Sequence, residues 1–164
     1  MSADQEGRIK QLTRKDAEEM LRVINEAARR YEGEIPADCY SEPYMPRSEL
    51  EEEKEKMRFL GYVAERLIGV IGLQTVGGAF LIRHLYVLPE FQRRGIGTRL
   101  LDFGLERATS DGIYVGTWED ARWAVEFYKA NGFETVDNSK ELLREYWDIP
   151  ERQVEESVVL RCRR

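Results

Sequence analysis

The stretch LIRHLYVLPEFQRRGIGTRLLDFGLERA, residues 81–108, contains the features that decide the fold. It begins as an apolar strand, breaks at Pro89, passes through a polar turn with two glycines and continues as a helix. The apolar residues of its second half recur at helical spacing; they are Ile96, Leu100, Leu101, Leu105 and Ala108. The stretch therefore predicts a strand, a turn and a helix in direct succession.

The turn at residues 92–97, Gln-Arg-Arg-Gly-Ile-Gly, has the composition of an anion site. Backbone N–H groups at a helix start lack intrahelical partners, and the helix dipole adds positive potential there. Gly95 and Gly97 have no Cβ, so the main chain can approach a ligand closely. Arg93 and Arg94 add permanent positive charge and several donors each. The turn predicts a site for phosphate or pyrophosphate.

The spacing of the turn excludes two other phosphate motifs. A dinucleotide-binding fingerprint has a third glycine three residues after the second, and that position is Leu100. A P-loop ends in Gly-Lys-Ser/Thr, a tripeptide that does not occur in the chain. The pattern that remains is Gln/Arg-x-x-Gly-x-Gly after an apolar strand.

Length and charge narrow the functional class. With 164 residues, 42% of them hydrophobic and 34% charged, the chain is expected to form a single domain over residues 1–164. Its formal net charge of −6 argues against nonspecific binding to nucleic acid or to an anionic membrane. An acidic surface instead favours a cationic acceptor such as an amine.

Cysteine and histidine content also limit the chemistry. Cys39 and Cys162 lie far apart without metal-ligand spacing, which favours a reducing, cytoplasmic location. A chain with one histidine offers no His-rich metal site. The first ten residues are polar and contain no signal-peptide core, and no apolar run is long enough to cross a bilayer.

Hydrophobic periodicity and turn residues predict the remaining elements. The expected strands are 8–12, 61–65, 67–76, 80–87, 113–118, 133–136 and 154–163, and the expected helices are 13–31, 48–59, 96–108, 120–130 and 139–147. Thr13 and Ser48 are read as N-caps, the latter in a capping box with Glu51. Residues 34–47 contain three prolines and are expected to form a loop packed over the core. The charged run 51–56 is read as a solvated helix face.

Two motifs in the right order resemble the GCN5-related N-acetyltransferases. The turn at 92–97 resembles motif A of that family, and residues 124–133, AVEFYKANGF, resemble its A-I-x-F-Y-x-K-x-G-F signature. The resemblance covers nearly the whole chain. It implies an α/β (α+β) fold with a mixed, mostly antiparallel central sheet flanked by helices. It also implies transfer of acetyl from acetyl-CoA to a primary amine by direct attack, without a metal.

The resemblance assigns the residues that hold acetyl-CoA, the cosubstrate. In this family the strand of motif A splays from its neighbour, here 113–118, and the pantetheine arm pairs with exposed main-chain groups near Leu85, Tyr86 and Val87. The pyrophosphate meets the turn and the first residues of the helix, which are Gln92, Arg93, Arg94, Gly95, Ile96, Gly97 and Thr98.

Tyr128 matches the family tyrosine that lies beside the thioester sulfur and donates its O–H to the leaving thiolate. The alternative is a helix aromatic packed in the core, as expected for Phe127. We favour the acid role for Tyr128.

The general base is less clearly marked. Some relatives use a carboxylate four residues before Leu85, but that position is Leu81. His84, the single histidine, has an ordinary pKa near 6.5 that suits proton abstraction at neutral pH. Strict alternation places it opposite Arg83, and a bulge would reverse that parity. A structural histidine, a water-mediated base at Glu119 or Asp120, or no dedicated base are the alternatives.

The acceptor side is the least determined. Arg83 and Trp118 are candidates for contact with the acceptor, although a tryptophan is more often a core residue. The aromatic segment 35–45 favours a small-molecule amine. The alternatives are a peptide or protein N-acetyltransferase and a non-catalytic acyl-CoA-binding sensor. A homodimer is a further expectation, because edge strands of this fold often pair.

Overall fold

The computed structural model describes residues 7–163, so most of the polar start of the chain lies outside the described part. The described strands are β1 (Arg8–Gln11), β2 (Arg58–Val63), β3 (Leu67–Val76), β4 (Ala79–Val87), β5 (Gly112–Trp118), β6 (Phe133–Thr135) and β7 (Ser157–Cys162). The α-helices are α1 (Ala17–Ala28), α2 (Arg47–Lys56), α3 (Ile96–Leu105), α4 (Arg122–Ala130), α5 (Ser139–Tyr146) and α6 (Glu151–Glu155). No helix in this part of the chain has the length and apolarity to span a bilayer.

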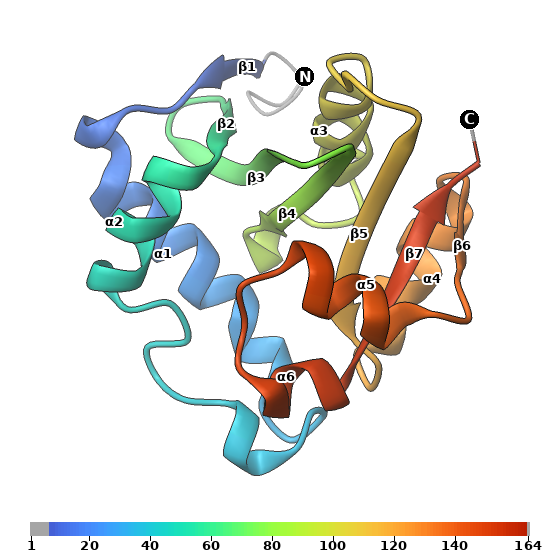
Figure 1. The fold of residues 1–164 in the computed structure, drawn as a ribbon. Helices are drawn as coiled ribbons and strands as arrows, with labels where there is room; N and C mark the ends of the chain where they lie inside the picture. Colours follow the sequence, from blue (N-terminus) through green and yellow to red (C-terminus); the bar gives the residue numbers. More distant parts are fainter. Residues whose placement is uncertain (1–6, 164) are drawn as a thin grey trace. The chain divides into compact units, whose positions relative to one another are not determined.

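The strands form one sheet in the order β1-β2-β3-β4-β5-β7-β6 (Figure 1). β4 and β5 pair in parallel. The β1–β2, β2–β3, β5–β7 and β6–β7 pairs are antiparallel. The mixed, mostly antiparallel sheet with flanking helices that the sequence predicted is confirmed.

The described chain divides into two compact units. The first contains residues 7–29, 42–74 and 83–107, and the second contains residues 30–41, 75–82 and 108–163. β3 and β4 each contribute residues to both units. Each unit has a hydrophobic core of its own.

The core of the first unit is built on the apolar stripe of α1. Met20, Val23 and Ile24 are fully buried there, at the spacing expected for one helix face. The predicted N-cap at Thr13 is confirmed: Thr13 and Asp16 form a capping box around a short 3₁₀ turn that leads into α1. α1 and α2 contact each other and lie side by side in Figure 1.

The segment before α2 is fastened to α1 by its backbone. The side-chain oxygen of Asn25 accepts a hydrogen bond from the Met45 N–H at 2.7 Å, and its amide donates to the Met45 carbonyl at 3.1 Å. The Met45 side chain is 2% exposed. This part of the predicted loop is therefore packed on the core, as expected.

The limits predicted for α2 are wrong. The capping box at Ser48 is absent from the helix start, because α2 begins at Arg47 with the extended residue Pro46 as its N-cap. At the other end Met57 has φ −148°, and β2 starts at Arg58. Phe59, read as the end of the helix, lies in β2 with 3% of its surface exposed. Burial of its ring in the core outweighs the local helical preference.

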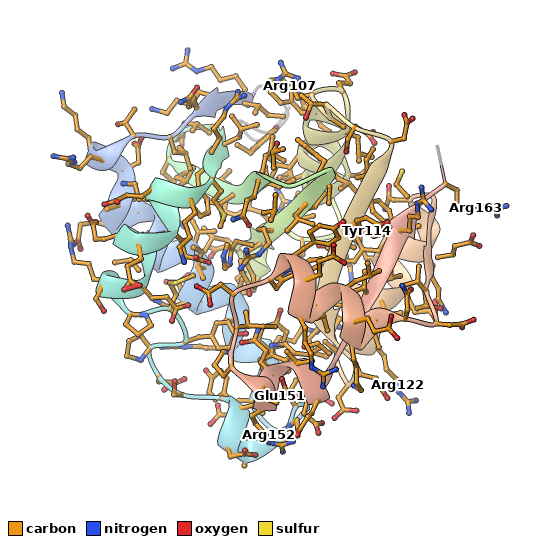
Figure 2. The ribbon with its side chains drawn as sticks, viewed as in Figure 1. Arg107, Tyr114, Arg122, Glu151, Arg152 and Arg163 are labelled. Atoms are coloured by element: carbon orange, nitrogen blue, oxygen red, sulfur yellow. The ribbon has the colours of Figure 1, made fainter. Side chains whose placement is uncertain are left out.

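The second unit packs α5 against β7, with Leu143, Trp147 and Val159 buried between them and their neighbours. Asp38, in a 3₁₀ turn of this unit, accepts hydrogen bonds from Nε of Arg152 at 2.8 Å and from its Nη2 at 3.1 Å. Figure 2 labels Arg152 on α6 beside Glu151. The 3₁₀ turn and α6 are therefore joined by a two-point ion pair.

Helix α6 was not predicted, and the strand expected from residue 154 starts only at Ser157. Pro150 lies between the predicted helix 139–147 and the predicted strand 154–163. In the structure it is the N-cap of α6, with φ −60° and ψ 150°. Proline is well tolerated at a helix start because the N–H it lacks would have no helical partner there.

Candidate active site

The predicted anion turn joins β4 to α3 through two left-handed residues. Arg93 has φ 67° and Gly95 has φ 80°, and Gly95 is the N-cap of α3. Such a conformation is ordinary for glycine and uncommon for arginine. Apart from Gly95 itself and its two chain neighbours, no atom of residues 7–163 is found within 4 Å of the position that a Cβ on Gly95 would occupy. The helix start therefore has open space beside Gly95, on the side where a side chain would otherwise project.

In the turn the two arginines are exposed, whereas Gln92 is hydrogen-bonded to the end of β4. Arg93 and Arg94 are exposed, and the Arg94 guanidinium lies 5.3 Å from the centre of the Phe91 ring. The Gln92 amide donates to the Val87 carbonyl at 2.9 Å and so fastens the turn to the end of β4. Ile96 is buried and anchors the first turn of α3, while Gly97 and Thr98 are half-buried. An exposed helix start with two arginines can bind an anion such as a pyrophosphate.

β4 pairs with β5 only along its first half. Its parallel pairing with β5 runs from Ala79 opposite Gly112 to Ile82 opposite Val115, and the strand continues to Val87. Two residues after the last pair, His84 has φ 52°. A left-handed residue inside a strand marks a local bulge. Beyond it, Leu85 and Tyr86 are half-buried and Val87 is buried.

The bulge brings Arg83 and His84 to the same atom. Nη2 of Arg83 lies 3.2 Å from Oε1 of Glu53, and Nε2 of His84 lies 2.7 Å from the same oxygen. Strict alternation along a strand places neighbouring side chains on opposite faces. In the structure the bulge places the side chains of Arg83 and His84 on the same side of β4, as predicted for a bulge at this point.

Glu53 was not predicted as a site residue. The run 51–56 was read as a solvated face, but the side chain of Glu53 is only 12% exposed. The signal was present, because Glu53 follows Leu50 by three residues and precedes Met57 by four, and both are buried. The spacing of three places Leu50 and Glu53 on one face of α2, and Met57 caps the end of that helix. The charge of the surrounding run concealed that face.

Electrostatics favour an ionised Glu53 and a neutral His84 near pH 7. Burial alone would raise the pKa of Glu53, but the hydrogen bond to His84 and the charges of His84, Arg83 and Lys56 bring it below its usual value. Burial lowers the pKa of His84, and the charge of Arg83 adds to this, against the opposing effect of Glu53. A neutral imidazole can accept a proton.

Tyr128 belongs to the second unit and is 7% exposed. Its ring meets those of Phe127 and Phe133 edge to face, with centroid distances of 5.2 Å and 5.7 Å. Burial, with a smaller effect of Tyr31, raises the pKa of its hydroxyl. Tyr128 therefore keeps its proton at neutral pH and can act as a donor.

The candidate acceptor residue Trp118 and the candidate bases Glu119 and Asp120 differ in solvent exposure. Trp118 is 6% exposed, as a core tryptophan would be, while Glu119 and Asp120 are exposed. Trp123 stacks on Tyr31 with centroids 5.9 Å apart, and the Arg30 guanidinium lies 4.3 Å from its ring centre.

Known proteins resemble both the sequence and the fold. Residues 58–135 match the family model of the acetyltransferase (GNAT) domain. An uncharacterised N-acetyltransferase of Methanocaldococcus jannaschii is 38% identical over 68 residues, which are 38% of this chain and 29% of that protein. The match thus spans less than a third of that relative's length.

Solved structures share the architecture at low identity. The PaiA N-acetyltransferase from Thermoplasma acidophilum, in complex with coenzyme A, has a TM-score of 0.73 at 22% identity, over 99% of both chains. The ribosomal-protein-S18-alanine N-acetyltransferase from Escherichia coli has a TM-score of 0.68 at 15% identity, over 95% of this chain and 92% of that chain. The matched segment, residues 58–135, contains both the anion turn and the 124–133 signature, so this part of the chain is similar to the acetyltransferase (GNAT) domain.

Proposed function

We propose that this protein transfers acetyl from acetyl-CoA to a primary amine of a small molecule by direct attack. The observation that carries the proposal is the helix start at Gly95, a left-handed glycine with open space on its Cβ side and exposed Arg93 and Arg94 beside it. It lies in the segment that matches the acetyltransferase family model. The thioester of acetyl-CoA supplies an already activated acetyl group.

The proposed cosubstrate contacts follow the chain from β4 into α3. Leu85, Tyr86 and Val87 offer main-chain groups to the pantetheine arm. The pyrophosphate is held by residues 92–98, with the N–H groups of Ile96, Gly97 and Thr98 as donors and the two arginines as counter-charges. Gln92 serves mainly to hold the turn against Val87, because its amide is already engaged there.

Two residues carry the proton transfers in this proposal. His84, neutral near pH 7, removes a proton from the attacking amine. Tyr128, whose raised pKa keeps the hydroxyl protonated, donates to the leaving thiolate. Arg83 and Trp118 are proposed to border the acceptor. Since Arg83 already binds Glu53 and Gln74, it would act through its position rather than as an unpaired cation.

Two other functions are the alternatives to a small-molecule acetyltransferase. The fold of the S18-alanine N-acetyltransferase is similar over most of both chains, which favours a protein N-terminus as an alternative acceptor. A non-catalytic acyl-CoA sensor would need the same anion turn without the proton-transfer groups. The presence of both His84 and Tyr128 favours an enzyme over such a sensor.

The decisive experiment measures thiol release from acetyl-CoA with a panel of polyamines, amino acids, aminoglycosides and short peptides. Titration calorimetry with acetyl-CoA accompanies it. Turnover with a small amine supports the proposal, and turnover with peptides alone favours the protein acceptor. Tight binding without turnover supports the sensor, and failure to bind any acyl-CoA would overturn the role of residues 92–98.

We also propose a cytoplasmic location and a homodimer. The location is proposed because the chain has only two cysteines, Cys39 and Cys162, without disulfide or metal spacing. Size-exclusion chromatography with light scattering tests the dimer, and a monomeric mass at micromolar concentration would contradict it.

A further inference from the structure

The first unit contains a buried polar cluster that the family motifs do not include. We call it the Glu53 cluster; its members are Glu53 on α2, Arg83 and His84 on β4, and Gln74 on β3. The three charged or titratable side chains are 11–14% exposed. Groups of this kind are expensive to bury unless each has a partner. The cluster satisfies this condition with hydrogen bonds among its own members.

Glu53 is held in place from a second direction. Nη2 of Arg83 donates to Glu53 at 3.2 Å, while Nη1 donates to Oε1 of Gln74 at 2.8 Å. The guanidinium is therefore fixed at two points, and it fixes the carboxylate. The His84 ring is limited by Phe59, whose ring stacks on it with centroids 5.8 Å apart. Both partners of the 2.7 Å contact thus have restricted orientations.

The contact between Glu53 and His84 decides which imidazole nitrogen carries the proton. An ionised carboxylate has acceptors only, so a hydrogen bond at Nε2 requires a proton on Nε2. A neutral imidazole has one N–H, so Nδ1 is then the nitrogen with a free lone pair. We propose that Glu53 is a positioning residue that holds His84 in the Nε2–H tautomer and makes Nδ1 the proton acceptor for the amine.

The backbone of β4 contributes to the same arrangement. His84 has φ 52°, a conformation that costs energy in most non-glycine residues. Without the bulge His84 would point away from the face that Arg83 uses. The left-handed residue therefore directs the ring to Glu53, and the hydrogen bond at 2.7 Å helps to offset the strain. A residue kept in such a conformation is often a functional one.

The charged groups around His84 determine whether its pKa rises or falls when Glu53 is substituted. α2 presents Glu53, whose pKa Lys56 lowers and whose charge raises the pKa of Glu49, and β4 presents Arg83. Glu53 raises the proton affinity of His84, while burial and Arg83 lower it. Removing the charge of Glu53 leaves only the lowering effects. His84 should then become a weaker base.

The catalytic part of this inference rests on the proposed acetyltransferase function, whereas the tautomer does not. Because the chain has one histidine, ¹⁵N-labelled protein gives a single imidazole in long-range ¹H–¹⁵N spectra. We expect Nε2 protonated and Nδ1 bare at pH near 8. A spectrum with the proton on Nδ1 would overturn the proposal, whether or not any amine is acetylated.

The variant Glu53→Gln keeps the shape of the side chain and removes its charge. We expect a lower His84 pKa by NMR titration and an equal downward shift of the acidic limb of the kcat/KM–pH profile. At pH near 7 kcat should fall about 10- to 100-fold, within the contribution of a general base. Glu52→Gln is the matched control, because Glu52 is an exposed neighbour on α2; it should leave the pKa and kcat unchanged.

The possible results distinguish a wrong assignment of Glu53 as a positioning residue from a wrong assignment of the protein as an acetyltransferase. If Glu53→Gln leaves the His84 pKa and the pH profile unchanged, Glu53 does not position the base. If no amine is a substrate but the tautomer and pKa shift are as expected, the proposed function fails and the positioning role of Glu53 stands. If Glu53→Gln does not fold, the wild-type spectrum alone decides.

Discussion

Glu53 and His84 are 31 positions apart in the chain, and their side chains meet at 2.7 Å in the first unit. The contact joins the buried face of α2 to the bulge of β4. Its two partners are both depressed in pKa, so both bind protons less readily in the folded protein than in the unfolded chain. Acidification should therefore oppose folding.

The pH dependence of stability provides a direct test. The unfolded chain binds a proton at His84 near its ordinary pKa of 6.5, above the pKa in the folded protein. The free energy of unfolding should thus decrease as the pH falls from about 7.5 to 5.5, by at most ~1.4 kcal/mol per pH unit for one proton. Glu53 contributes in a separate window, since its stabilisation is lost as the pH falls below 4.5 through the folded pKa.

His84→Asn is a suitable comparison, because asparagine tolerates the left-handed backbone better than most residues. Urea unfolding at the two pH values should show a smaller dependence for the variant than for the wild type. The chain has no other histidine to titrate in this range. Equal slopes for the two proteins would contradict the lowered pKa of His84.

Much of the fold could be predicted because its determinants are local. The stripe of α1, the β2–β3 hairpin at Arg66 and the turn before α3 follow from periodicity, turn residues and glycines in short windows. α6 was not predicted because a proline such as Pro150 can follow the end of one helix or begin the next. The local sequence does not distinguish these two roles.

The Glu53 cluster could not be predicted from the sequence for a different reason. The pattern left the orientations of Arg83 and His84 open, and only the left-handed φ of His84 decides them. Glu53 comes from a helix whose charged run suggests full solvation. A contact between residues 31 positions apart depends on tertiary packing, which no short window contains.

The proposed acid role of Tyr128 predicts a specific kinetic change. Tyr128→Phe removes the hydroxyl and keeps the ring that packs on Phe127 and Phe133. We expect kcat to fall about 100-fold, as for loss of a general acid, with an unchanged Kd for acetyl-CoA. Tyr146→Phe is the control, since that ring stacks on Tyr114 elsewhere in the unit. An unchanged kcat would remove Tyr128 from the mechanism.

The helix start at Gly95 predicts a coupled loss of stability and affinity. Gly95→Ala meets no neighbouring atom, so its effect comes from the left-handed backbone alone, about 1–2 kcal/mol in the free energy of unfolding. Realignment of the first N–H groups of α3 should also weaken acetyl-CoA binding. Gly78→Ala is the matched control, because its Cβ also enters open space but its φ is not left-handed. Equal stability of the two variants would contradict the strain.

The hydrogen bonds between Asn25 and Met45 are expected to stabilise the first unit and to hold α2, which carries Glu53, in position. Asn25→Ala removes both hydrogen bonds to the Met45 backbone, and leaving these groups unpaired should cost about 1–3 kcal/mol in urea unfolding. Asn25→Asp retains the acceptor and should lose less. Since Met45 lies two residues before α2, which carries Glu53, loosening it should also change the ¹⁵N shifts of His84. Faster amide exchange at Met45 with unaltered His84 shifts would show that α2 is held independently of this tie.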